Sequence, residues 1–86
     1  MSQVILSSTF QRQPKKLVKN NPRLKSKINK ILNYLIKDIS HSSLRLHKLS
    51  GRNNWSISVT HDVRMIIHLE GNQVFCLRIG SHDQAY

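Results

Sequence analysis

The side chains in this sequence that can exchange protons near neutral pH are mainly histidines. The titratable histidines and acids are His41, His47, His61, His68, His82, Asp38, Asp62, Glu70 and Asp83. With arginine and lysine, histidine supplies what metal-independent RNA cleavage needs: a base for the 2′-hydroxyl, an acid for the leaving 5′-oxygen and a cation for the phosphorane. Five scattered histidines are nevertheless more often solvated surface groups than an active site, so composition alone leaves both interpretations open.

Several other kinds of site have no support in the sequence. No HxxxH or HxxE pair falls on a predicted helix, and there is no Gly-rich phosphate loop, so we expect neither a metal nor a cofactor. Cys76 is the only cysteine, which excludes a disulfide framework and favours a reducing, cytoplasmic location. No apolar run approaches the ~20 residues of a membrane span, and residues 1–10 lack the pattern of a secretory signal.

The charge balance favours a polyanionic partner. Lysine and arginine number 14 against four acids, which gives a formal net charge of +10, and residues 12–37 contain nine basic residues and no acid. Such an excess favours nucleic acid, an acidic protein segment or an anionic surface. We take as candidate contacts to a polyanion such as RNA the residues Lys25, Lys27, Lys30, Lys48 and Arg52. For Lys48 an ordinary solvated charge is the stronger interpretation.

The N-terminal half predicts a short strand followed by a helical hairpin. The apolar run at residues 4–6 predicts the strand, and Ser8 with Gln11 has the spacing of a capping box. Pro14 either kinks the first helix or is its true first residue. Asn21 and Pro22 start a second helix. Its apolar stripe has the 3.6-residue period and comprises Leu24, Ile28, Ile31, Leu32, Leu35 and Ile36.

The C-terminal half predicts strands. Residues 44–49 and 55–59 alternate apolar and polar side chains, and residues 63–69 and 74–79 follow with short turns between them. Short loops join antiparallel neighbours. We therefore expect one α+β domain over residues 1–86, with an N-terminal strand, a helical hairpin and a mainly antiparallel sheet of three to four further strands. The helices pack on one face, and the other face or its concave edge is left for function. Trp55 belongs to the core.

Four segments carry a resemblance to a known family. They are LRLHKLSG at 44–51, WSISV at 55–59, VRMII at 63–67 and IGSHDQAY at 79–86. Together they resemble the RelE/ParE superfamily of toxin–antitoxin toxins, most closely its RelE/YafQ/YoeB-like branch. The resemblance implies the RelE-like fold and a ribosome-dependent endonuclease that cuts mRNA in the A site. It also implies a cognate antitoxin as partner, with a toxin that is monomeric alone and hetero-oligomeric in the complex.

The resemblance also implies roles for individual residues. His82 matches a C-terminal histidine that donates or accepts a proton, and Tyr86 matches a terminal aromatic that positions the substrate. Arg64 matches an arginine near the scissile phosphate. The alternative interpretation is that Arg64 has only a structural role, in an ion pair with Asp62 or Asp83. His47 matches a histidine on the strand before the loop. The alternative interpretation is that His47 is an outward-facing polar residue of the strand without a catalytic role.

The sequence also departs from the family pattern. Val59 and Val63 stand where YafQ-like members carry a histidine and an aspartate, and the glutamate base of YoeB-like members has no clear counterpart. We choose His47 as the general base, with Asp62 or His61 in reserve. Two alternatives stay open: a ParE-like inhibitor of DNA gyrase, and a catalytically weak member that mainly binds antitoxin.

Overall fold

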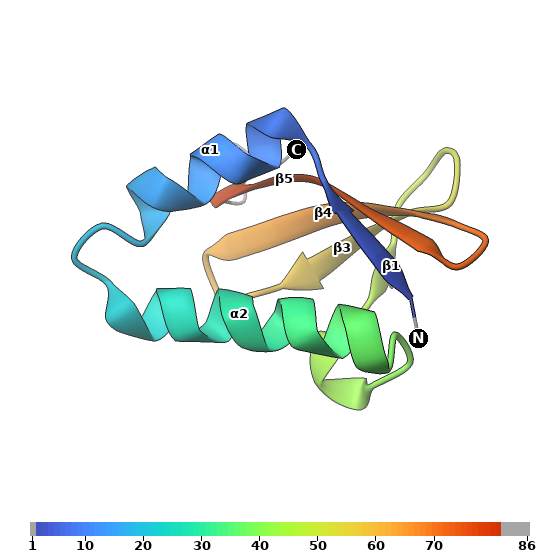
Figure 1. The fold of residues 1–86 in the computed structure, drawn as a ribbon, viewed down its shortest axis with the longest axis horizontal. Coiled ribbons are helices and arrows are strands. Elements are labelled where there is room, and N and C mark those ends of the chain that lie inside the picture. The colour runs from blue at the N-terminus through green and yellow to red at the C-terminus, as the bar shows by residue number, and fades with distance from the viewer. Residues whose placement is uncertain (1, 82–86) are drawn as a thin grey trace.

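The computed structural model describes residues 2–81, which form two α-helices, one short 3₁₀ helix and a mixed sheet (Figure 1). The elements in chain order are β1 (Gln3–Leu6), α1 (Ser8–Leu17), α2 (Pro22–Lys37), η1 (Ser42–Leu44), β2 (His47–Lys48), β3 (Asn54–Ser58), β4 (Val63–Glu70) and β5 (Gln73–Ser81). Within these residues the sheet has five strands in the order β1-β5-β4-β3-β2. The predicted α+β class is confirmed, with four strands after the helices.

The strands after the helices are antiparallel to one another, as the short loops predict. The turn between β4 and β5 contains Gly71 at φ 58°, a left-handed conformation that glycine adopts without steric cost. The N-terminal strand pairs in parallel with β5, from Gln3 opposite Gln73 to Leu6 opposite Cys76. The first and last strands of the described chain are therefore neighbours in the sheet.

The residue that caps the first helix is Ser7, one residue earlier than expected. The Oγ of Ser7, not of Ser8, accepts a hydrogen bond from the N–H of Phe10 at 3.0 Å, and Ser7 also donates to the carbonyl of Leu77 at 2.7 Å. The predicted capping residue was wrong because Ser7 is also tied to β5, a contact that local spacing does not contain. Pro14 lies inside α1, so the helix begins before it.

The second helix begins as predicted. Asn21 Oδ1 accepts a hydrogen bond from the N–H of Leu24 at 3.2 Å, and Pro22 is the first helical residue. The helix is amphipathic, and its buried residues are Leu24, Ile28, Ile31 and Leu35. None of the helices within residues 2–81 is long and apolar enough to cross a membrane.

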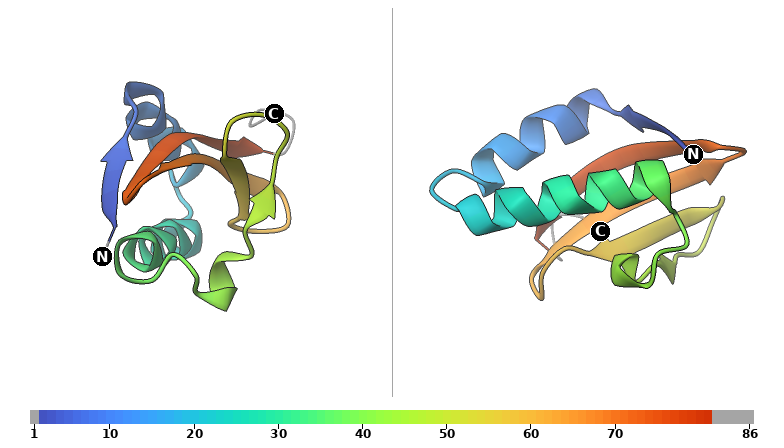
Figure 2. Two further views of the ribbon diagram at one scale, coloured as in Figure 1. Left: turned by 90° about the vertical axis from the view of Figure 1, so that its right-hand side faces the viewer. Right: turned by 60° about the horizontal axis from the view of Figure 1, so that its bottom comes forward.

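The core lies between the helices and one face of the sheet. Phe10 of α1 and the buried stripe of α2 pack with Ile57, Met65 and Ile67 from the central strands. Figure 2 shows α2 across one face of the curved sheet, while no described helix covers the opposite face. Trp55 is half-buried against this core, as predicted. On this opposite face, which we call the uncovered face, the side chains of His47 and Arg78 are exposed.

The expected strand at 44–49 is mostly not a strand. Only His47 and Lys48 pair with β3, while residues 42–44 form the 3₁₀ helix η1 and Arg45 adopts a left-handed φ of 48°. Leu44 is fully buried in the core. The alternation of apolar residues in this segment therefore does not come from a paired strand. It arises because the chain turns here and its apolar side chains still contact the core.

Cys76 is fully buried in the core, on β5. Burial raises the pKa of its thiol to about 12, because the thiolate would lose hydration there. The thiol therefore stays protonated at neutral pH and cannot act as a nucleophile.

The buried stripe of α2 should dominate the stability of the domain. Leu35→Ala removes a side chain that is 0% exposed, and we expect it to lower the free energy of unfolding by about 2–5 kcal/mol. Leu6→Ala makes the same chemical change at a position that is 37% exposed, and it should cost less than about 1 kcal/mol. Urea denaturation followed by circular dichroism measures both. Equal losses would show that the helix-facing core is not the main source of stability.

Candidate functional site

One row of side chains crosses the uncovered face of the sheet. His47 on β2 is opposite Ser56, Ser56 is opposite Ile66, and Ile66 is opposite Arg78 on β5. Directly opposed residues in neighbouring strands point to the same face. The structure therefore places His47, the predicted base, in line with an arginine that the sequence analysis did not single out.

The two ends of this row are open and its middle is closed. His47 and Arg78 are exposed, whereas Ser56 is 3% and Ile66 is 2% exposed. Three inter-strand spacings separate the backbones of His47 and Arg78, which is about 14 Å. The row therefore has an exposed imidazole at one end and an exposed guanidinium at the other.

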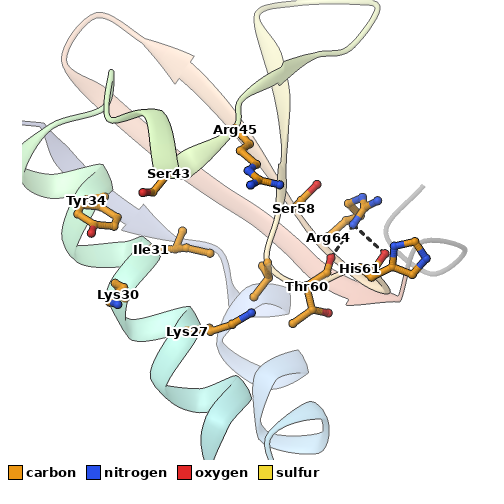
Figure 3. Close-up of a pocket in the computed structure, with 11 residues that line it drawn as sticks. Lys27, Lys30, Ile31, Tyr34, Ser43, Arg45, Ser58, Thr60, His61 and Arg64 are labelled. Atoms are coloured by element: carbon orange, nitrogen blue, oxygen red, sulfur yellow. Dashed lines mark hydrogen bonds between the residues drawn. The ribbon is translucent and has the colours of Figure 1, made fainter.

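Arg64 lies one row nearer the turn between β3 and β4, opposite Ser58 on one side and Gly80 on the other. Its Nη1 donates to the carbonyl oxygens of Thr60 at 2.8 Å and His61 at 3.1 Å (Figure 3). These two bonds fix the orientation of the guanidinium. Within residues 2–81 these bonds use neither Nε nor Nη2, whose parallel N–H groups match the two oxygens of a phosphate.

A groove of about 600 Å³ runs between α2 and the end of β3. Its described lining residues are Lys27, Lys30, Ile31, Tyr34, Ser43, Arg45, Ser58, Val59, Thr60, His61 and Arg64 (Figure 3). None of these eleven is acidic, and four are lysine or arginine. Unpaired like charges around a concave surface focus a positive potential. The groove is therefore suited to an anionic chain, and Arg64 connects it with the open face of the sheet.

The other predicted basic contacts are placed differently. Lys25 is exposed on α2 but is not among the groove residues. Lys48 is next to His47 in sequence, so it points to the opposite side of the sheet, where its Nζ lies 5.0 Å from the Trp55 ring centroid and donates to Asn53 Oδ1 at 3.2 Å. Arg52 lines a separate depression on the uncovered face. Of the five predicted basic contacts, only Lys27 and Lys30 line the groove together with Arg64.

The remaining histidines differ in how they are held. His41 stacks on Tyr34 with ring centroids 4.0 Å apart, and its Nδ1 accepts a hydrogen bond from the N–H of Ser43. His61, the reserve base, is exposed and lines the groove, and Asp62 beside it is exposed too. The predicted residues His82 and Tyr86 lie outside the described residues. They remain predictions from the sequence.

Arg78 is the residue that sequence reasoning missed. Val74 and Cys76 face the core, so simple alternation along β5 would send Arg78 to the core side as well. A β-bulge leaves Leu77 without a partner on β4, because Ile67 is opposite Cys76 and Ile66 is opposite Arg78. The extra residue reverses the phase of the strand and brings Arg78 to the open face.

The described residues offer no metal site. Within residues 2–81 no group of three or more histidine, cysteine, aspartate or glutamate side chains is close enough to hold a metal ion. The described surface carries His47 with the guanidinium groups of Arg64 and Arg78, and it adjoins a groove with four lysine or arginine residues.

Known proteins resemble this chain in structure and not in sequence. No family model matches the chain, and no curated protein matches its sequence. A copper-bound mutant toxin from Helicobacter pylori is 24% identical with a TM-score of 0.82, and each chain is covered over 100% of its length. YafQ from Escherichia coli, solved in complex with DinJ, is 19% identical with a TM-score of 0.82, covering 100% of this chain and 99% of that one.

A third similar structure is a YoeB/ParE toxin from Agrobacterium tumefaciens, which is 14% identical with a TM-score of 0.80 and covers 93% of this chain and 98% of its own. All three are bacterial toxins, and all three superpose over nearly the whole length. The RelE-like fold expected from the sequence is confirmed. At these identities the likeness shows the fold alone, and the activity has to be argued from the residues.

Proposed function

We propose that this protein is the toxin of a toxin–antitoxin pair and acts as a ribosome-dependent mRNA endoribonuclease. The observation that carries the proposal is the uncovered face of the sheet, where His47, Arg64 and Arg78 lie beside a groove with no acidic residue among its described lining. The toxin fold supports it. The sequence resemblance to RelE/YafQ/YoeB-like toxins points to the same activity.

The proposed reaction is a transesterification that needs no metal. His47 takes the proton of the 2′-hydroxyl, the oxygen attacks the adjacent phosphorus, and a 2′,3′-cyclic phosphate forms as the bond to the 5′-oxygen breaks. His82 gives a proton to that leaving oxygen. Arg64 and Arg78 donate hydrogen bonds to the phosphorane oxygens, where negative charge accumulates. Tyr86 positions the nucleotide.

The proposed partner that silences the toxin is an antitoxin that carries acidic or amphipathic segments. The net charge of +10 attracts such a segment, and a partner that binds the folded toxin stabilises it by mass action. The Escherichia coli structure with DinJ is a toxin–antitoxin complex on the same fold. We propose that the antitoxin covers or displaces residues 80–86, which carry His82 and Tyr86. In the cytoplasm the toxin would be monomeric when free.

Programmed ribosomes test the function directly. Purified protein added to ribosomes with a defined A-site codon should cut the mRNA at that codon, while the same RNA without ribosomes should be cut far more slowly because the ribosome orients it. Trapping of DNA gyrase on broken DNA with intact mRNA would establish the ParE-like alternative. Tight antitoxin binding without cleavage of any codon would establish the catalytically weak alternative.

The groove makes a prediction about salt dependence. Replacing Lys27 and Lys30 by alanine should weaken ribosome binding and lower the slope of log affinity against log salt by about 1–2, because two phosphate contacts are lost. Lys25→Ala removes one charge from the same helix outside the groove, and it should change the slope much less than either Lys27→Ala or Lys30→Ala alone. Filter binding at several salt concentrations measures the slopes. Equal effects of all three lysines would mean that overall charge, and not the groove, governs binding.

A further inference from the structure

A second depression lies on the uncovered face of the sheet, away from the groove. It has a volume of about 400 Å³ and is lined by Arg52, Asn54, His68, Glu70, Phe75 and Leu77. This volume falls within the ~300–1,000 Å³ of small-molecule sites. Asn54, His68 and Phe75 are opposite one another on β3, β4 and β5, so they form a row of their own.

We infer that this depression is a nucleobase subsite, which takes the base of a nucleotide next to the cleaved phosphodiester. The inference rests on the proposed function and deepens it. Along β4, His68 is two residues from Ile66, which lies in the row of His47 and Arg78. Two residues of a strand span about 6–7 Å. An RNA chain held over the His47–Arg78 row can therefore place a neighbouring base here.

The floor of the depression is an aromatic and aliphatic surface. The rings of His68 and Phe75 have centroids 6.0 Å apart and are tilted by 48°. Leu77, the bulge residue without a partner on β4, adds to this floor, and both Phe75 and Leu77 are half-buried. Flat apolar surface of this kind is what unstacked bases bind, and every base can stack on it.

The rim of the depression has a fixed polar geometry. His68 Nδ1 lies 3.0 Å from the carbonyl oxygen of Arg52 and 2.7 Å from Asn54 Oδ1. Because a carbonyl oxygen can only accept, Nδ1 carries the proton, and in the neutral ring Nε2 is an acceptor of fixed orientation. The Asn54 amide nitrogen is a donor on the same rim.

The charged rim residues favour a base over other ligands. Arg52 can donate hydrogen bonds and Glu70 can accept them, so donors and acceptors surround an aromatic floor. A phosphate would be repelled by the Glu70 carboxylate, and a purely apolar side chain would leave the rim groups without partners. A planar heteroaromatic base, with N–H donors and ring acceptors at its edges and a π face, matches both parts.

Direct binding tests the subsite without any cleavage. A short RNA with 2-aminopurine beside a 2′-deoxy cleavage site should lose fluorescence on binding, because stacking quenches 2-aminopurine. Phe75→Ala should weaken the binding about tenfold and remove the quenching. Phe75→Trp restores a ring and should restore both. Phe75→Leu keeps apolar volume if the alanine variant does not fold, and it should lose the quenching. Unchanged quenching in a folded Phe75→Ala or Phe75→Leu variant would overturn the inference.

Cleavage on programmed ribosomes gives the second arm. For the parent protein, an abasic nucleotide at the neighbouring position should slow single-turnover cleavage about tenfold. For Phe75→Ala the abasic nucleotide should cost nothing further, because the ring and the base form one contact. Full additivity of the two changes would overturn the subsite while leaving the nuclease intact. A Phe75→Ala variant that loses antitoxin affinity and keeps RNA binding would overturn it too, and assign the depression to the antitoxin.

Discussion

Replacing Arg64 by alanine should slow the cleavage of ribosome-bound mRNA about 100-fold or more. The guanidinium is held through Nη1 by the carbonyl oxygens of Thr60 and His61, and within residues 2–81 these bonds do not use Nε and Nη2, the pair that matches two phosphate oxygens. Donors fixed in advance stabilise the charge of a transition state more than mobile ones, and the loss of one such group typically costs 10²–10³ in rate. Single-turnover cleavage on programmed ribosomes measures the effect.

The controls for Arg64 must separate chemistry from folding, because its side chain also holds the turn between β3 and β4. Arg64→Lys keeps the charge and loses the paired donors, so it should recover only a small part of the rate. Thermal unfolding of each variant reports the loss of the turn contacts. A stable Arg64→Ala variant with the parental rate, beside a slow Arg78→Ala variant, would move the phosphate contact from Arg64 to Arg78.

Replacing His47 by alanine should slow cleavage by about 10²–10⁴, the usual contribution of a general base. A general base must be unprotonated to act, so the parental rate should rise with pH as the base loses its proton. The His47→Ala variant should lose this rise. The pH dependence of the single-turnover rate is therefore the decisive measurement, since a purely structural role would lower the rate equally at every pH.

Four other single variants and one double variant complete the test of His47. His61→Ala and Asp62→Asn remove the reserve bases, and the variant that abolishes the rise with pH identifies the base. His41→Gln is a matched histidine control, since its ring stacks on Tyr34 and its Nδ1 accepts from the N–H of Ser43. His82→Ala should remove the opposite limb of the profile, where the acid must be protonated. In the double variant with His47→Ala the effects should not add, because both residues serve one proton transfer sequence.

Local sequence determined the elements whose signals are local. Asn21 and Pro22 fix the start of α2 through a capping hydrogen bond and a preset φ, both of which are properties of adjacent residues. The stripe of apolar residues in α2 fixes which face is buried. The strands β3, β4 and β5 lie close to the predicted ranges because the alternation and the short turns are also local. The helical hairpin and the antiparallel sheet follow from these local signals.

Local sequence also identified His47 and Arg64 as candidates, through motifs that resemble those of a known family. It did not identify Arg78. One unpaired residue, Leu77, reverses the direction of every later side chain on β5, and nothing in the run Val74–Ile79 marks where the extra residue falls. Hydrogen bonds to the neighbouring strand decide that position.

Only the tertiary structure decided which distant residues share a surface. The parallel pairing of β1 with β5, the capping of α1 by a serine tied to Leu77, and the groove that joins Lys27 and Lys30 to Arg64 all connect residues far apart in the chain. Lys25, Lys27 and Lys30 have one chemistry and lie on one helix, yet only two of them line the groove. Composition and hydrophobic period determine whether a segment forms a helix or a strand. Strand register and the packing of α2 against the sheet determine which residues its side chains contact.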